Sequence, residues 1–203
     1  TNNFCTFNPI FTGQRGTFTE GNTKIVTNVQ GSVNYGQSVL GTFLLSSGKW
    51  YWEIECDAIG SGGATGIGAA ERIDAGIYYN GHNLLGSTGN SHYSSAGHVK
   101  ISAESDVGTD VDTYTDGDII GIALDLDNSK IYWSKNGSWQ DSGNPAGGSG
   151  GQSLTSSYND NWVPFCSKDD TSNNATFIAN FGNPPNSISS SQADDAGYGN
   201  FEY

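Results

Sequence analysis

Two short apolar stretches, joined by a polar turn, lie in the second half of the chain and are compatible with few structures other than a pair of β-strands. Residues 119–126 are rich in Ile and Leu, mostly at every second position, which is typical of a β-strand. Residues 127–129, Asp-Asn-Ser, form a polar turn, and Lys130–Lys135 is the expected returning strand. Asn136 and Gly137 then indicate a further hairpin, because both residues tolerate the positive φ that tight hairpin turns require.

Similar β-rich segments recur along the rest of the chain, whereas helical periodicity is hard to find. Groups of Gly, Asn and Ser separate these segments and favour turns between them. We expect strands at residues 16–20, 23–29, 38–45, 49–56, 65–70, 119–126, 130–135, 162–166 and 175–181. Many short strands at such spacing predict an all-β protein, a sandwich or a barrel, with little or no helix.

The composition agrees with this interpretation and excludes some classes of partner. The chain has 203 residues, of which 29 are glycine, 34% are hydrophobic and 12% are aromatic, so we expect a core of Trp, Tyr and Phe side chains. A net charge of −13, from 8 basic and 21 acidic residues, repels nucleic acid phosphates and anionic membranes. No apolar run is long enough to span a bilayer. We therefore expect neither nucleic-acid binding nor membrane insertion.

Three cysteines, Cys5, Cys56 and Cys166, leave two arrangements open. One is a disulfide with one free thiol, and the other is a set of three buried, reduced thiols, since a free Cys often behaves as a small apolar side chain.

Three segments do not fit the strand pattern. Residues 72–114 and 142–161 resemble long insertions, and loops of that length inside a compact domain are usually functional or mobile. The first holds all three histidines, and the second is rich in Gly and Ser. Residues 183–203 are rich in Pro, Ser and Asn. We expect a single domain over residues 1–182 and an extended C-terminal arm over residues 183–203.

Several motifs, in order along the chain, resemble the SPRY domain family. They are SGKWYWE at residues 47–53, GDIIGIALD at 117–125, SKNG at 134–137, WVPF at 162–165 and FIANFG at 177–182. The resemblance covers nearly the whole chain and implies a two-sheet antiparallel β-sandwich of the concanavalin-like jelly-roll type. It also implies a binding module instead of an enzyme, with its binding loops at one edge.

Both ends of the chain resemble SPRY-containing proteins of bacteriophage genomes. The motif NFCTFNP at residues 3–9 and the tail SISSSQADDAGYGNFEY at 187–203 carry this second resemblance. It implies a subunit of a virion or extracellular appendage, such as a tail fibre, a decoration protein or a filament. The aromatic residues of the two ends are then candidates for assembly contacts: Phe4, Phe7, Phe11, Tyr198, Phe201 and Tyr203.

Aromatic and histidine side chains in the expected loops are candidates for ligand or partner contacts, because rigid rings beside small polar residues suit recognition. These candidates are Tyr78, Tyr79, His92, Tyr93 and Trp139. Trp162 is expected in the core. Trp50 and Trp52 alternate with Tyr51 and are also expected in the core, with an exposed platform that stacks on sugars as the alternative.

No residue group indicates catalysis or a cofactor. Glu53 and Glu55 project to one face of a strand and could form the acid pair of a glycoside hydrolase, but paired strand acids usually only face solvent. A calcium site is a metal alternative, and its candidates are Asp106, Asp110 and Asp112. The histidines His82, His92 and His98 lack a recognisable zinc-ligand spacing. Asn136 and Asn174 begin glycosylation sequons, although Asn136 better suits a hairpin turn.

The sequence thus predicts a non-enzymatic structural or binding protein that assembles with its own copies or with other virion or fibre proteins and displays recognition loops. The alternative is a carbohydrate- or protein-binding module of a larger extracellular fibre protein, with a cell-surface glycan or a host protein as its partner. A hydrolase that uses Glu53 and Glu55 is a third hypothesis.

Overall fold

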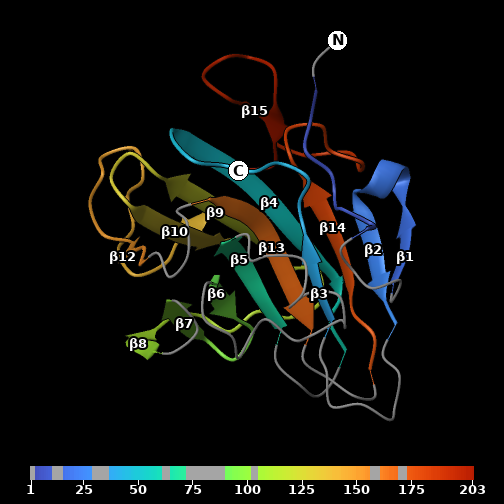
Figure 1. Ribbon diagram of the computed structural model, residues 1–203, viewed down its shortest axis with the longest axis horizontal. Coiled ribbons are helices and arrows are strands. Elements are labelled where there is room, and N and C mark those ends of the chain that lie inside the picture. The colour runs from blue at the N-terminus through green and yellow to red at the C-terminus, as the bar shows by residue number, and fades with distance from the viewer. Residues whose placement is uncertain are drawn as a thin grey trace.

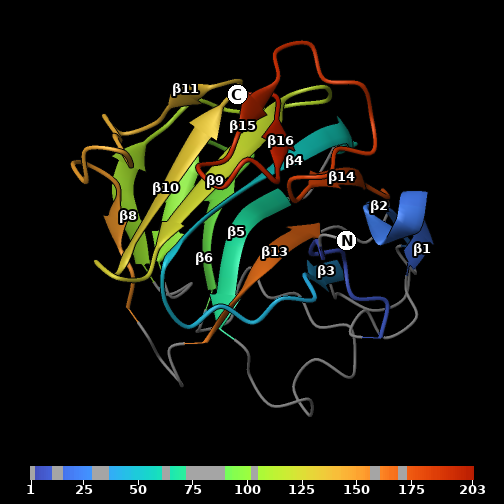
Figure 2. The ribbon, with the colours of Figure 1, turned by 90° about the horizontal axis from the view of Figure 1, so that it is seen from above.

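Two antiparallel β-sheets face each other in the computed structural model of the chain (Figures 1 and 2). The structure describes residues 3–10, 16–28, 37–60, 65–71, 90–101, 105–155, 161–168 and 173–203. The first sheet has the order β1 (Gly16–Thr19), β2 (Lys24–Thr27), β14 (Thr176–Asn180), β4 (Lys49–Ala58), β9 (Ile119–Asp125), β10 (Lys130–Lys135) and β11 (Ser138–Trp139), and β12 (Gln152–Ser153) also pairs with β10. The second sheet has the order β3 (Gln37–Leu40), β13 (Trp162–Lys168), β5 (Thr65–Glu71), β6 (Asn90–Ser94), β7 (His98–Ile101) and β8 (Ser105–Asp110).

The remaining elements are small. One 3-10 turn, η1 (Glu20–Asn22), is the only helical element in the part of the chain that the structure describes. Strands β15 (Gln192–Ala193) and β16 (Asn200–Phe201) pair with each other near the C-terminus. The predicted all-β, two-sheet sandwich is therefore confirmed. None of the described residues form a helix that is long and apolar enough to cross a membrane.

The hairpins predicted in the middle of the chain are both present. Strand β9 turns into β10, and β10 turns into β11 through Asn136 and Gly137. These two residues have φ values of 48° and 78°, the left-handed conformation that a two-residue hairpin loop requires. The Asn136 side-chain amide donates to Asp118, and its oxygen accepts the Ile119 N–H, both at 2.8 Å. The predicted turn role of Asn136 is confirmed.

The expectation of one long insertion over residues 72–114 is wrong for its second half, where β6, β7 and β8 extend the second sheet. Strand β6 buries the polar residues Ser91, His92 and Ser94, so it lacks the apolar alternation that marks the other strands. Its neighbour β5 is built from small residues, and a Cβ added at Gly68 would lie 2.0 Å from the Ser91 carbonyl oxygen. Close packing against this glycine gives β6 a place in the sheet that its hydrophobicity does not indicate.

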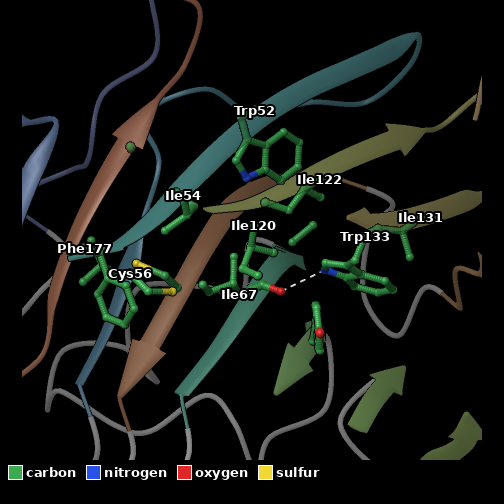
Figure 3. Close-up of a cluster of buried hydrophobic side chains, with 14 of the residues drawn as sticks. Trp52, Ile54, Cys56, Ile67, Ile120, Ile122, Ile131, Trp133 and Phe177 are labelled. Atoms are coloured by element: carbon green, nitrogen blue, oxygen red, sulfur yellow. Dashed lines mark hydrogen bonds between the residues drawn. The ribbon is translucent and has the colours of Figure 1, made fainter. Parts of the chain in front are cut away.

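The core between the sheets contains large aromatic side chains, as the composition predicts, but Ile, Leu and Val outnumber them among its described residues. Trp52 is 2% exposed and packs among isoleucines from β4 and β9 (Figure 3). Across the core, the Trp133 indole N–H donates to the Ile67 carbonyl oxygen at 2.9 Å (dashed line in Figure 3). This hydrogen bond links β10 of the first sheet to β5 of the second. Trp162 is also buried, as expected.

Trp50 departs from the prediction. It was expected in the core beside Trp52, but its side chain is 41% exposed. Its indole N–H donates to the Ser47 carbonyl oxygen at 2.8 Å, at the beginning of β4. Strand alternation predicts the face on which a side chain lies, but it does not predict where along the strand the core ends.

The three cysteines are buried free thiols, which decides between the two arrangements left open by the sequence. Burial raises the pKa of the Cys5, Cys56 and Cys166 thiols above the ordinary value. All three are therefore protonated and poorly reactive in the folded protein.

The last residues of the chain bind back onto β4 through Glu53, whose side chain is 2% exposed. Its carboxylate accepts the backbone N–H groups of Glu202 and Tyr203 at 3.0 and 2.9 Å. The Asn180 side-chain amide and the Tyr51 hydroxyl donate to it at 2.9 and 3.1 Å. The division into a domain over 1–182 and an arm over 183–203 stays a prediction, but the end of the segment is bound to the first sheet of its own chain.

Replacing Trp52 with Ala is expected to lower the free energy of unfolding by about 3–5 kcal/mol, because the change leaves a cavity in the core. Trp50→Ala is the matched control, and its loss should be clearly smaller because that indole is half exposed. Urea denaturation of both variants measures the difference. Equal losses would contradict the position of Trp50 outside the core.

Replacing Glu53 with Gln is expected to lower the free energy of unfolding by about 1.5–3 kcal/mol, since an amide has one acceptor oxygen for a site that receives four donors. Hydrogen–deuterium exchange should become faster in the peptide that contains Glu202 and Tyr203. Glu55→Gln is the control, because Glu55 is partly exposed and receives one long bond of 3.3 Å from Asn186. Unchanged exchange at the C-terminus of the Glu53 variant would refute the proposed attachment.

The free energy of unfolding is expected to fall in acid because of two carboxylates beside the hairpins, those of Asp118 and Asp125. Burial raises the pKa of Asp118 and Asp125, but hydrogen bonds and lysine charges outweigh it and hold both values below the ordinary 3.8. Their stabilising effect is therefore complete above pH 3.8 and is lost as the pH falls through the lower folded values. Asp118→Asn should flatten this part of the profile of unfolding free energy against pH. Glu20→Gln, which removes an exposed charge, should leave it unchanged.

Candidate functional site

A groove of about 760 Å³ lies where the C-terminal segment meets the end of the sandwich. Figure 1 shows this segment, in red, above β4 and β14, at the end of the molecule where the N-terminus also lies. The groove is dominated by aromatic rings from well-separated parts of the chain, namely Phe4, Phe43, Trp50, Tyr51, Trp52, Trp139, Phe181, Tyr198, Phe201 and Tyr203.

Strand β4 supplies two rings that lie on opposite faces. Trp50 lies on the same face as Trp52, beyond the buried core, and its N–H bond to Ser47 holds the indole in place. Tyr51 lies on the other face, where its ring contacts Phe201 and Trp139 edge-on, with centroids 4.9 and 6.3 Å apart. The groove is thus built around the beginning of one strand.

The C-terminal segment supplies one wall and an exposed ring. Between β15 and β16, the Asp194 side chain accepts the Tyr198 N–H at 2.8 Å, and its carbonyl oxygen accepts the Gly197 N–H at 3.0 Å. Gly197 has φ of 71°, which a glycine adopts without strain. This turn presents the Tyr198 ring, which is 65% exposed. On the outer side, Glu202 accepts hydrogen bonds from Ser189 and stabilises the segment.

The Gly/Ser-rich segment also contributes to the groove. Its residues 142–155 lie in the described part of the chain and form a hydrogen-bonded turn, in which Asn144 and Ser149 pair with each other. Gly151 packs against the Tyr132 ring with φ of 68°. Pro145 from this turn and Trp139 from β11 both line the groove. The prediction that this segment carries ligand contacts stays a prediction.

The charges along the groove are mostly negative. Lys49 is the only basic residue among the lining residues, and its ammonium lies 2.9 Å from the Asp125 carboxylate. The hydrogen bond and charge of Asp125 raise the pKa of Lys49. Asp194 and Asp195 also line the groove and are exposed. Since Lys49 is already paired, the two aspartates give the groove its remaining charge.

Glu53, one of the two carboxylates of the hydrolase hypothesis, has a structural role. Both oxygens of Glu53 accept donors from the protein itself, and the side chain is buried. Glu53 and Glu55 border a second, small hollow of about 60 Å³ beneath residues 184–188. A site this small and this well bonded does not suit a sugar substrate.

The loop residues singled out in the sequence have different positions. Tyr93 and His92 are buried in β6, because the segment expected to be a loop is a strand, and the Tyr93 hydroxyl donates to the Asp112 carbonyl oxygen. Trp139 is partly exposed and lines the groove. Tyr78 and Tyr79 lie outside the described residues.

The candidates for assembly contacts differ in how far their side chains are exposed. Phe7 and Phe201 are buried within this chain, and Phe4 is partly buried in the groove. Tyr198 and Tyr203 are 65% and 44% exposed, and Phe11 lies outside the described residues. A role of these residues in assembly stays a prediction.

Only one of the three calcium candidates has a side chain in the described part of the chain. Asp112 is exposed, and the side chains of Asp106 and Asp110 lie outside the described part of the chain. Among the described residues, no group of three or more His, Cys, Asp or Glu side chains could hold a metal ion.

Trp50, Phe43 and Pro145 also line the groove. Trp50 was expected in the core, with an exposed platform as the alternative, and its exposure agrees with that alternative at this residue. Phe43 and Pro145 carry no pattern that separates them from ordinary strand or turn residues. Their common role appears only when the C-terminal segment is placed over the beginning of β4.

Comparison with known proteins agrees with this architecture. Residues 49–176, more than half of the chain, match the family model of the SPRY domain. The crystal structure of the SPRY domain of human HERC1 is similar, with a TM-score of 0.59 and 16% identity over 85% of this chain and 96% of that chain. At that identity the likeness shows the fold alone. A search of curated proteins finds no match. On the strength of the family match and the two-sheet fold, the chain belongs to the SPRY domain family.

Proposed function

We propose that this chain is a non-enzymatic binding module that holds a segment of a partner protein in the aromatic groove. The observation that carries the proposal is the exposure of three large rings at one site: Trp50, Tyr198 and Tyr203 are 41%, 65% and 44% exposed. Clustered exposed apolar surface is unfavourable in water and commonly marks an interaction site. Trp and Tyr are also the residues that most often dominate binding energy at protein interfaces.

The family supports a protein partner, since SPRY domains are generally protein-binding modules and not typically enzymes. The site itself is argued from the geometry of this chain, because part of it lies beyond the family match at residues 49–176. In particular, the wall made by Tyr198, Phe201 and Tyr203 belongs to the C-terminal segment.

A glycan is the second candidate ligand, favoured by the exposed faces of Trp50 and Tyr198. Aromatic rings of this kind suit stacking on sugar rings. Binding on a glycan array that Trp50→Ala abolishes would support this candidate over a protein partner.

The finer role predicted from the sequence, a subunit of a bacteriophage virion or extracellular appendage that assembles with its own copies, stays a proposal. Its support is the resemblance of residues 3–9 and 187–203 to phage sequences. Light scattering of the purified chain tests the assembly, which a stable multimer would support and a strict monomer at high concentration would contradict.

Selection of random linear peptides displayed on a carrier tests the groove. Peptides enriched on the chain should lose binding to Trp50→Ala and Tyr198→Ala by about tenfold or more, since each variant removes an anchoring ring. Ile10→Ala is the matched control, because Ile10 is 87% exposed and does not line the groove. Circular dichroism confirms that each variant is folded. Peptides that bind the Trp50 variant as well as the original chain would place recognition elsewhere.

A further inference from the structure

The groove combines exposed aromatic rings with carboxylates on one turn of the C-terminal segment. Asp194, Asp195 and Tyr198 lie within five residues of one another between β15 and β16, and all three line the groove. Asp194 is fixed by its bond to the Tyr198 N–H. Asp195 is exposed and is not paired with any cation in the described part of the chain. The same turn therefore carries an exposed carboxylate and an exposed ring.

Among the described residues, Lys49 is the one lysine that lines the groove, and Lys130, two strands away on β10, donates to the Gly150 carbonyl oxygen at 2.9 Å. Lys49 is paired with Asp125 at 2.9 Å. Elsewhere Lys24 is paired with Asp57 at 3.0 Å, and Lys135 with Asp118 at 3.4 Å. With 8 basic and 21 acidic residues in the whole chain, a negative surface potential extends beyond the groove. A partner segment that carries positive charge would therefore be complementary to the groove.

We infer that the segment bound in the groove carries an arginine, whose guanidinium stacks on the aromatic rings and pairs with Asp195. This inference rests on the proposed function and names the chemistry of its partner. A cation over an aromatic face is attracted by the ring, and Trp is the strongest such ring. A carboxylate beside the ring adds a charge-assisted hydrogen bond.

The planar shape of the site favours arginine over lysine. A guanidinium can lie flat on a ring while its edge donates two hydrogen bonds to a carboxylate, whereas an ammonium is compact and strongly hydrated. Exposed Trp50 and Tyr198 provide the flat surfaces, and Asp195 provides the acceptor. The excess of negative charge also attracts such a segment from a distance, so binding should weaken as salt is added.

The experiment uses the peptides selected on the complete chain. Those that depend on Trp50 should be enriched in arginine relative to the starting library. One such peptide is synthesised with its arginine, with lysine and with glutamine at that position, and binding is measured by fluorescence anisotropy. Glutamine should weaken binding by about tenfold, and lysine by less. Asp195→Asn on the chain should weaken the arginine peptide by about threefold to tenfold and leave the glutamine peptide unchanged.

Glu20→Gln is the control for charge alone, because it removes one exposed negative charge on η1, outside the groove. It should leave the affinity for the arginine peptide within experimental error. If the selected peptides depend on Trp50 but bind equally with arginine or glutamine, the inference fails while the proposed function stands. If lysine binds as well as arginine, the planar stacking is refuted. If no selected peptide depends on Trp50, the proposed function fails and the inference fails with it.

Discussion

The buried carboxylate of Glu53 determines where the C-terminal segment lies, and the groove depends on it. A carboxylate in an apolar environment is unfavourable unless its oxygens are hydrogen-bonded, and here four donors satisfy it. Two of these donors are backbone N–H groups of the last two residues, so the carboxylate has all four hydrogen bonds only while the segment is in place. The same bonds bring Phe201 against Tyr51 and complete one wall of the groove.

The groove lies at one end of the two packed sheets, and its exposed rings lie outside the core. The two sheets are joined through a hydrophobic core and the bond from Trp133 to Ile67. The groove combines the beginning of β4 with single residues of β9, β11 and β13 and with rings from the N-terminal and C-terminal segments. Such an arrangement allows the rim residues to change without loss of the core, because exposed substitutions away from packed features usually have small effects on stability.

The sequence predicts those parts of the structure that local patterns encode. Strands β4, β9 and β10 show apolar alternation, and Asn136 with Gly137 requires the turn that is observed. Strand β6 was missed because Ser91, His92 and Ser94 are buried polar residues and its place in the sheet depends on a glycine in β5. Strand β7 buries the apolar residues Val99 and Ile101 but spans only four residues. The groove was missed for a different reason. Glu53 and Tyr203 are 150 positions apart, and no local pattern indicates that they meet.

The strand order of the two sheets has a consequence for folding during synthesis. Strand β14 lies between β2 and β4, and β13 lies between β3 and β5, so late segments fill the middle of both sheets. Until residues 162–180 leave the ribosome, four earlier strands have an edge with no neighbour. Contacts between such distant segments form slowly, and unpaired edges favour association with other chains in the meantime. Each sheet of the nascent chain therefore has a gap between two strands for most of its synthesis. The sandwich can be completed only after β13 and β14 have been synthesised.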